Sequence, residues 1–239
     1  MIFYLFALIV LSPFIILTFQ FIIGKIKYDK TAYALQTKSS FSSVRFDKGK
    51  YGEYLTYDKL KNLDGYKKFL FNCYIPKGDN ETTEIDLLMI HNTGVYVFES
   101  KNYSGWIFGS ESQKNWTQTL PNGKKVRKER FLNPVIQNKG HIKWLKKFLY
   151  DQDSITYYSI IVFSERCTLK KVDIQTNECK VVKRENILST IKTIIKNTTP
   201  ILSNQQIDAI FQKLFPLTQK TEIEKLQHIE NIKNNYNIL

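Results

Sequence analysis

The stretch TEIDLLMIHNTGVYVFESKN, residues 83–102, decides the fold of this chain. Apolar and polar residues alternate on both sides of HNTG, a pattern typical of a β-hairpin. A turn at Asn92-Thr93 and a four-residue loop over 91–94 predict the same register, because both loops have even length. The rungs then lie on one face of the hairpin: Ile90 with Val95, Leu88 with Val97, Asp86 with Glu99, and Glu84 with Lys101.

The far end of this face is ionic. Carboxylates that lie directly opposite each other repel, so Asp86 opposite Glu99 calls for a compensating group. A divalent cation such as Mg²⁺ or Mn²⁺, which prefers hard oxygen ligands, is one explanation. Lys101 would then hold an attacking water or the charge of a phosphate. The alternative is a solvated ladder in which Glu84 and Lys101 form an ordinary surface ion pair.

Two motifs outside the hairpin add polar groups. GKYGE at 49–53 places Glu53 in the first turn of a predicted helix. NPVIQ at 133–137 places Gln137 near the start of another helix, whose N-terminus favours anions such as phosphate. Gln137 is equally well explained as a routine polar surface residue. His141, one turn later, could assist the site, although we expect it to lie on the helix surface.

Taken together, GKYGE, TEIDLLMI, GVYVFESKNYSG and NPVIQN resemble the nuclease-related domain, NERD, over about residues 45–165. That family is regarded as a branch of the PD-(D/E)xK nucleases. The resemblance implies a restriction-endonuclease-like core and a nuclease site. Ser100 departs from the β-branched residue that is commoner between the glutamate and the lysine, and our register points it to the opposite face.

The resemblance also implies a role for each site residue. Asp86 and Glu99 would bind Mg²⁺ or Mn²⁺, and Lys101 would position the attacking water. Glu53 would act through a second metal ion or a water bound to one. Gln137 would orient a ligand or the phosphate.

The N-terminal residues 1–24 carry no charged side chain. A helix of that length covers about 36 Å, enough to cross a hydrocarbon core of about 30 Å. A cleaved secretory signal is the alternative, but it would have a basic start and a small-residue cleavage site. Lys25, Lys27 and Lys30 follow the run, so the sequence predicts a single-pass membrane anchor with the rest of the chain in the cytoplasm.

The net charge is +13, from 35 Lys and Arg against 22 Asp and Glu. A basic segment beside a phosphate-cutting site suits nucleic acid, whereas an anionic lipid surface and simple solubility are the alternatives. Trp106 and Trp116 could stack on bases, although we expect both to pack in a core. The cations expected to bind nucleic acid are Lys124, Lys125, Arg127, Lys128, Arg130, Lys139 and Lys143.

The order of predicted elements is helix, three strands, helix, strand, which indicates an α/β fold with a mixed sheet. The predicted helices and strands are 50–63, 69–75, the two arms of the hairpin, 133–150, 157–163, 180–183, 185–196 and 203–214. We expect a transmembrane anchor over 1–24, a polar tether over 25–44, the NERD domain over 45–165 and a C-terminal extension over 166–239.

Composition excludes several classes of protein. Hydrophobic residues make up 43% of the chain, too many for intrinsic disorder. Three widely spaced cysteines and three histidines fit neither a disulfide framework nor a zinc site. The favoured function is a metal-dependent nuclease acting on DNA or RNA. The alternatives are a non-catalytic module of the same fold that binds nucleic acid or a partner, and a structural protein whose helices over 185–239 dock a partner.

Overall fold

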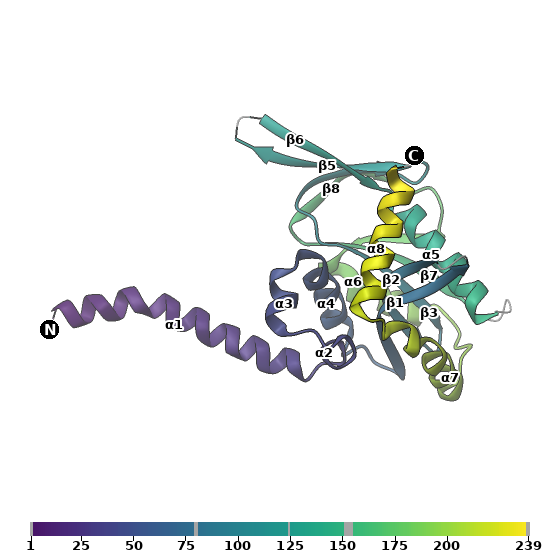
Figure 1. Cartoon of the computed structure of the whole chain (residues 1–239), viewed down its shortest axis with the longest axis horizontal. Helices are drawn as coiled ribbons and strands as arrows, with labels where there is room; N and C mark the ends of the chain where they lie inside the picture. Colours follow the sequence, from purple (N-terminus) through teal and green to yellow (C-terminus); the bar gives the residue numbers. More distant parts are fainter. Residues whose placement is uncertain (1, 79–80, 124, 151–154, 238–239) are drawn as a thin grey trace.

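The computed structural model describes residues 2–78, 81–123, 125–150 and 155–237, so Lys124 lies outside the described residues. The chain forms a mixed α/β structure with two mixed sheets flanked by helices (Figure 1), which confirms the predicted class. The helices are α1 (Ile2–Asp29), α2 (Ala32–Thr37), α3 (Phe41–Phe46), α4 (Lys48–Leu60), α5 (Pro134–Leu149), α6 (Ile187–Lys196), α7 (Asn204–Leu214) and α8 (Glu222–Asn237), with 3₁₀ turns at Arg184–Asn186 and Phe215–Thr218.

The first sheet has the order β1-β2-β3-β7-β9 and the second β6-β5-β4-β8. Within the first sheet, β1, β2 and β3 are antiparallel, whereas β3, β7 and β9 are parallel. The strands are β1 (Lys67–Gly78), β2 (Glu81–His91), β3 (Gly94–Lys101), β4 (Gly105–Ser110), β5 (Asn115–Asn122), β6 (Lys125–Leu132), β7 (Tyr157–Phe163), β8 (Cys167–Asp173) and β9 (Cys179–Lys183).

Both faces of the first sheet are buried. Phe71, Leu87 and Phe98 point to a core shared with α2, α3 and α4. Leu88 and Val97 point to a second core shared with α5 and α7. The strands of this sheet therefore separate two layers of helices, and side chains of alternate parity on β2 and β3 reach opposite layers.

The hairpin register agrees with the prediction near the turn. Ile90 pairs with Val95, and His91 pairs with Gly94, which leaves a two-residue turn. The β2–β3 ladder then ends at the Leu87–Phe98 pair, while β3 stays paired with β7 as far as Lys101. The rungs predicted beyond Leu87 are therefore absent from the described ladder. Beyond this point β2 stays paired with β1 as far as Glu81, while β3 stays paired with β7, so the two strands diverge.

Helix α4 packs closely against the chain just after β3. A Cβ atom built on Gly52 would lie 2.6 Å from the Cβ of Asn102, closer than such atoms approach in proteins. The Asn102 amide also donates a 2.7 Å hydrogen bond to the Lys48 carbonyl. The second glycine of GKYGE thus allows the helix that carries Glu53 to approach β3.

Residues 25–44 are ordered and partly buried, in contrast to the predicted polar tether. They form the end of α1 and the helices α2 and α3, with Tyr28, Tyr33 and Val44 buried. Helices α2 and α3 were missed because each is only six residues long and shows no periodic pattern. This segment therefore belongs to the packed core.

The prediction of a single-pass membrane protein, with an anchor over residues 1–24, is wrong. The part of the chain that the structure describes contains no helix with the length and apolar character needed to cross a membrane. Helix α1 projects from the rest of the molecule (Figure 1), but its last turns pack on α3. There the Phe21 and Phe41 rings lie 5.0 Å apart, and Tyr28 is fully buried.

The tight contact at Gly52 gives the first testable prediction. We expect Gly52→Ala to lower the free energy of unfolding by about 1–3 kcal/mol, because the added methyl group would force α4 away from Asn102. Gly140→Ala is the matched control, since a Cβ there meets no atom within 4 Å. It should raise stability by about 0.5–1 kcal/mol. Urea unfolding measures both changes, and equal stability of the two variants would contradict the predicted contact.

Candidate active site where two strands diverge

The C-terminal end of β3 carries an ion pair between Glu99 and Lys101. Glu99 is 1% exposed, and its Oε1 accepts a 2.6 Å hydrogen bond from the Lys101 ammonium. Lys101 donates a second bond, 3.2 Å long, to the Gln137 side-chain oxygen. Glu99, Lys101 and Gln137 are thus brought together by β3 and the first turn of α5. The alternative of a surface ion pair between Glu84 and Lys101 does not hold, because Lys101 pairs with Glu99 instead.

His141 completes the hydrogen bonding of Glu99. Its Nε2 lies 3.1 Å from Glu99 Oε2, and its Nδ1 lies 2.6 Å from the Thr83 hydroxyl. A carboxylate only accepts hydrogen bonds, so Nε2 carries the proton that is donated to Glu99. His141 is 4% exposed. The expectation of a surface histidine is therefore wrong.

These partners control the ionisation of the pair. Burial raises the pKa of Glu99, but Lys101 and His141 outweigh it and lower the pKa to about 2. Burial lowers the pKa of Lys101, but Glu99 and Asp86 outweigh it and raise the pKa above its usual range. Both groups are therefore charged at neutral pH, and each stabilises the other in the protein interior.

Asp86 lies where β2 leaves β3. Its Oδ2 accepts a 2.9 Å hydrogen bond from the Ser100 backbone N–H, where the β2–β3 ladder has ended. Burial, followed by the charges of Glu99 and Glu53, raises its pKa well above the usual range, although Lys101 opposes the shift. Burial and the two neighbouring carboxylates therefore outweigh the positive charge of Lys101 at Asp86.

Glu53 reaches the same region from α4. Its Oε2 lies 3.3 Å from the Tyr33 hydroxyl and 3.3 Å from the Asn72 amide nitrogen, and Asn72 also bonds Glu84. Burial and the Glu84 charge raise the pKa of Glu53 to about 7. Asn72 has a φ of 50°, in the left-handed region that Asn tolerates better than most residues. This conformation lets one side chain bridge the two carboxylates.

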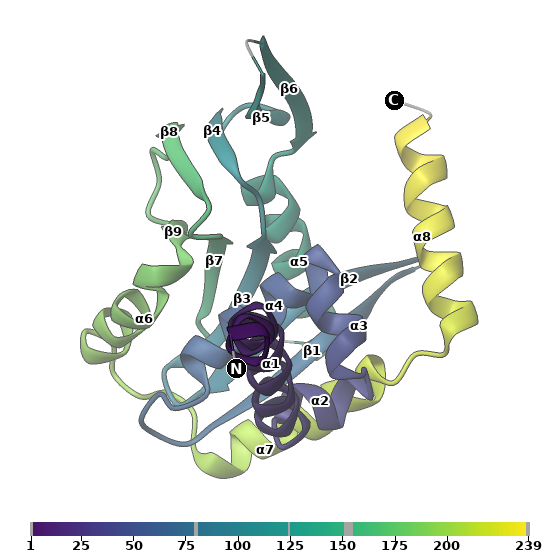
Figure 2. The ribbon, with the colours of Figure 1, turned by 90° about the vertical axis from the view of Figure 1, so that its left-hand side faces the viewer.

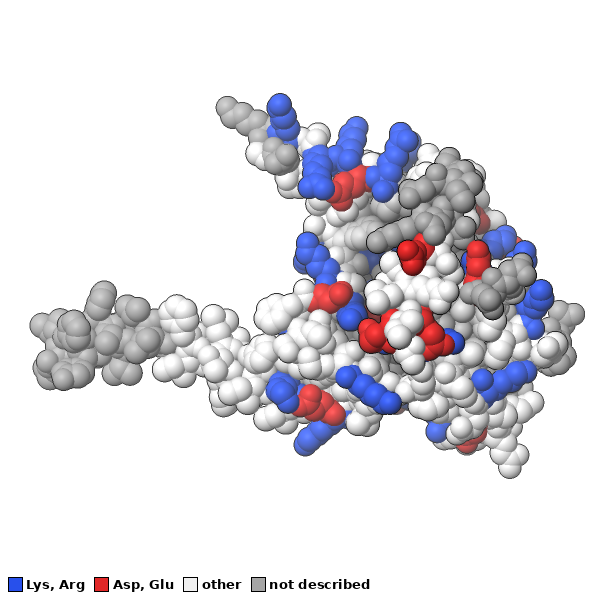
Figure 3. All heavy atoms as spheres, in the orientation of Figure 1, with Lys and Arg blue, Asp and Glu red and all other residues white. Residues whose placement is uncertain are grey.

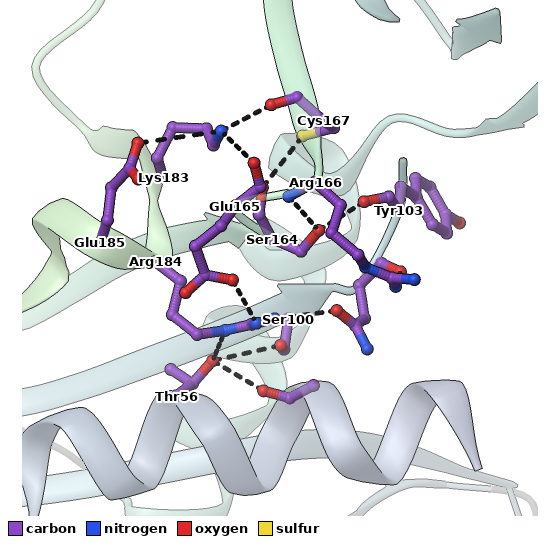
Figure 4. A network of polar contacts seen from close by, with 12 residues as sticks. Thr56, Ser100, Tyr103, Ser164, Glu165, Arg166, Cys167, Lys183, Arg184 and Glu185 are labelled. Atoms are coloured by element: carbon purple, nitrogen blue, oxygen red, sulfur yellow. Dashed lines mark hydrogen bonds and ion pairs between the residues drawn. The ribbon is translucent and has the colours of Figure 1, made fainter. Parts of the chain in front are cut away.

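Ser100 points away from this cluster, as the register predicts. Its hydroxyl lies 3.3 Å from that of Thr56 on α4. Beside them, the guanidinium of Arg184, 1% exposed, bonds Glu165, Asn102 and Thr56 (Figure 4). This network joins α4, the ends of β3 and β7, and the turn after β9. It holds the far side of β3 in place while Glu99 and Lys101 face α5.

Several of these contacts were not predicted. The five predicted residues lie around the point where β2 and β3 diverge, and their role as a site stays a prediction. His141, for which a surface position was favoured, lies four residues after Gln137, and that spacing places both on one face of a helix. Arg184 carried no comparable signal, because its partners are more than eighty positions earlier, apart from Glu165.

The site offers few ligands to a divalent cation. Among the described residues, no group of three or more His, Cys, Asp or Glu is arranged to hold a metal ion. The available donors are the carboxylates of Asp86 and Glu99, and Mg²⁺ commonly uses one or two carboxylates and keeps several waters. The raised pKa of Asp86 favours added positive charge there. Glu99 would exchange one of its present partners for the ion, so the fit rests on two carboxylates.

The predicted basic residues divide between two surfaces. Lys125, Arg127, Lys128 and Arg130 are exposed on β6, in the hairpin that projects from the molecule (Figures 1 and 3). Lys139 and Lys143 are exposed on α5, and at 100° per residue they face away from Gln137 and His141. The described cations therefore do not form a single basic stripe beside the site.

The fold and the site define a mixed α/β protein with a buried carboxylate–lysine cluster on its central strands. A model of the nuclease-related domain matches residues 48–164. An uncharacterized protein of Bacillus anthracis is 32% identical over 191 residues, which are 79% of this chain and 85% of that protein. The chain therefore belongs to the nuclease-related domain family. No solved structure matches it.

The raised pKa of Glu53 predicts how stability depends on pH. A carboxyl whose pKa is higher in the folded state stabilises that state below its unfolded pKa, and the contribution is lost as pH rises through about 7. A full shift would correspond to about 3 kcal/mol. Because the side chain keeps some contact with solvent, we expect a loss of about 2 kcal/mol between pH 5 and 8 in EDTA.

Glu53→Gln should remove this part of the pH dependence, and Glu185→Gln, at an exposed position, should leave it unchanged. Urea unfolding at several pH values measures the slopes. Parallel slopes for wild type and Glu53→Gln would contradict the assignment.

Proposed function

We propose that this protein is a divalent-metal-dependent phosphodiesterase that cleaves DNA or RNA. The single observation that carries the proposal is the buried Glu99–Lys101 pair beside Asp86, at the N-terminal end of α5. Membership of the nuclease-related domain family supports it. Asp86 and Glu99 would hold Mg²⁺ or Mn²⁺, which would lower the pKa of the attacking water and neutralise phosphate oxygens.

Lys101 acts in this proposal as a fixed positive charge. Glu99 and Asp86 hold its pKa above the usual range, so the side chain carries its proton. Hydrogen bonds to Glu99 and Gln137 hold the ammonium in one position. From there it would orient the attacking water and stabilise charge that develops on the phosphate.

The remaining groups position the site. Gln137 fixes Lys101, and His141 fixes the second oxygen of Glu99. Burial and the Glu84 charge raise the pKa of Glu53 to about 7, so its ionised form is disfavoured. A cation or a bound water nearby would favour its ionised form, consistent with the auxiliary role that the family resemblance implies.

Cleavage assays with the full chain test the proposal. We expect wild type to cleave single- or double-stranded DNA or RNA with Mg²⁺ or Mn²⁺ and to be inactive in EDTA. Asp86→Ala and Lys101→Ala should lower the rate at least about 100-fold, since each removes charge stabilisation made in the transition state. Lys139→Ala, on the opposite face of α5, is the matched control and should stay within about threefold of wild type. Metal-dependent cleavage that survives in Asp86→Ala would contradict the proposal.

One observation favours a second candidate, a non-catalytic module that binds nucleic acid or a partner. Both oxygens of Glu99 are already bonded, one to Lys101 and one to His141. In that case the cluster serves only to stabilise the fold. Salt-sensitive binding of nucleic acid that is unchanged in Asp86→Ala, without cleavage by wild type, would support this candidate.

A further inference from the structure

One face of the second sheet packs in a hydrophobic core, and the other face carries exposed side chains. In the register of this sheet, Trp106 on β4 pairs with Thr119 on β5, which pairs with Lys128 on β6. Phe108, Thr117 and Arg130 form the adjacent row. Because paired residues share a face, these side chains all lie on one side of the sheet.

The opposite side of the sheet is buried. Ile107, Trp116 and Phe131 pack there with Phe163 of β7. Trp116 is fully buried, with its ring stacked on Phe163 at 6.0 Å, whereas Trp106 is 47% exposed. The expectation that both tryptophans pack in the core is therefore correct for Trp116 and wrong for Trp106. Trp106 and the 58% exposed Val126 thus leave apolar surface open to solvent on this face.

A hollow of about 750 Å³ lies over this face. Its lining consists of two threonines together with Trp106, Phe108, Val126, Lys128 and Arg130, and it contains no carboxylate. The ammonium of Lys170, from β8, lies 5.7 Å from the centre of the Trp106 ring. The surface thus combines aromatic rings with several cations.

We propose that this face binds single-stranded nucleic acid, with a base stacked on Trp106 and phosphates bound by Lys128 and Arg130. Stacking on an aromatic side chain requires an unpaired base, because the faces of bases in a duplex are already covered. The absence of acidic groups in the lining and the cations around it complement a polyanion. An uninterrupted duplex would contact only the cations and leave Trp106 and Val126 in water.

The position of this face links it to the candidate active site. Trp106 follows Lys101 by five residues, a chain distance of at most about 18 Å. If the protein cleaves nucleic acid, this face indicates that the substrate is a single strand. This link to cleavage rests on the proposed function. Binding itself does not depend on catalysis.

The test measures the binding of the full chain to a fluorescent 15-nucleotide oligothymidylate by anisotropy in EDTA, where no cleavage is expected. Trp106→Ala should weaken binding about 10-fold or more, given the contribution of a stacked base. Trp106→Phe should recover most of the loss. Phe46→Ala, which removes a 78% exposed aromatic side chain elsewhere, is the matched control and should bind as wild type does.

Further arms identify the ligand. An oligouridylate of the same length tests RNA against DNA, and a duplex of the same length should bind more weakly and lose little affinity in Trp106→Ala. Lys128→Ala should reduce the dependence of log affinity on log salt by about 0.7, as expected for one contact with a single-strand phosphate. Polyglutamate should compete poorly, because it offers charge without a base to stack.

Three results would overturn the inference: unchanged binding by Trp106→Ala, equal competition by polyglutamate, or a dimer of the wild-type chain that is lost in Trp106→Ala. The last result would identify a second copy of the chain as the occupant. Failure of the proposed function looks different. If no cleavage is found with any metal while Trp106→Ala still loses single-strand binding in EDTA, the binding face stands and the nuclease does not.

Discussion

A carboxylate buried in the middle of a protein needs positive charge and hydrogen bonds, and the structure around Glu99 supplies both. Lys101 and His141 bond its two oxygens, and their attraction outweighs the effect of burial on its pKa. Breaking a buried pair of this kind is strongly destabilising, because it leaves an uncompensated charge. The packing of α5 against β3 therefore depends on the bonds that Glu99 makes.

Asp86 and Glu53 do not have such partners, and this difference gives the site its chemical character. Their pKa values are raised, whereas that of Glu99 is lowered, although all three carboxyls influence one another. Groups with ionisation shifted in opposite directions within one cluster are typical of functional sites. The stability that an added cation would restore is the physical reason to look for a metal here.

The two faces of β3 have separate tasks. Glu99 and Lys101 face α5, while Ser100 faces α4 and the network around Arg184 (Figure 4). Further along the chain, β4 continues into the second sheet, which buries Trp116 and exposes Trp106. Helix α8 lies beside the far ends of β1 and β2 (Figure 2), where His228 bonds Thr82. Thr56, Arg184 and His228, which contact the strands of the first sheet or the network beside them, thus come from distant parts of the chain.

The sequence by itself determined the hairpin, its register near the turn, the mixed α/β class and the family, because alternation and local motifs encode these directly. It also predicted α5 and its start at Asn133-Pro134, where the Asn133 side chain caps the helix. Only the tertiary structure decided that β2 leaves β3 after Leu87, that His141 is buried against Glu99, and that the apolar N-terminal run ends in packing against α3. These outcomes depend on contacts between residues distant in the chain, and no local pattern specifies which partner a side chain will find.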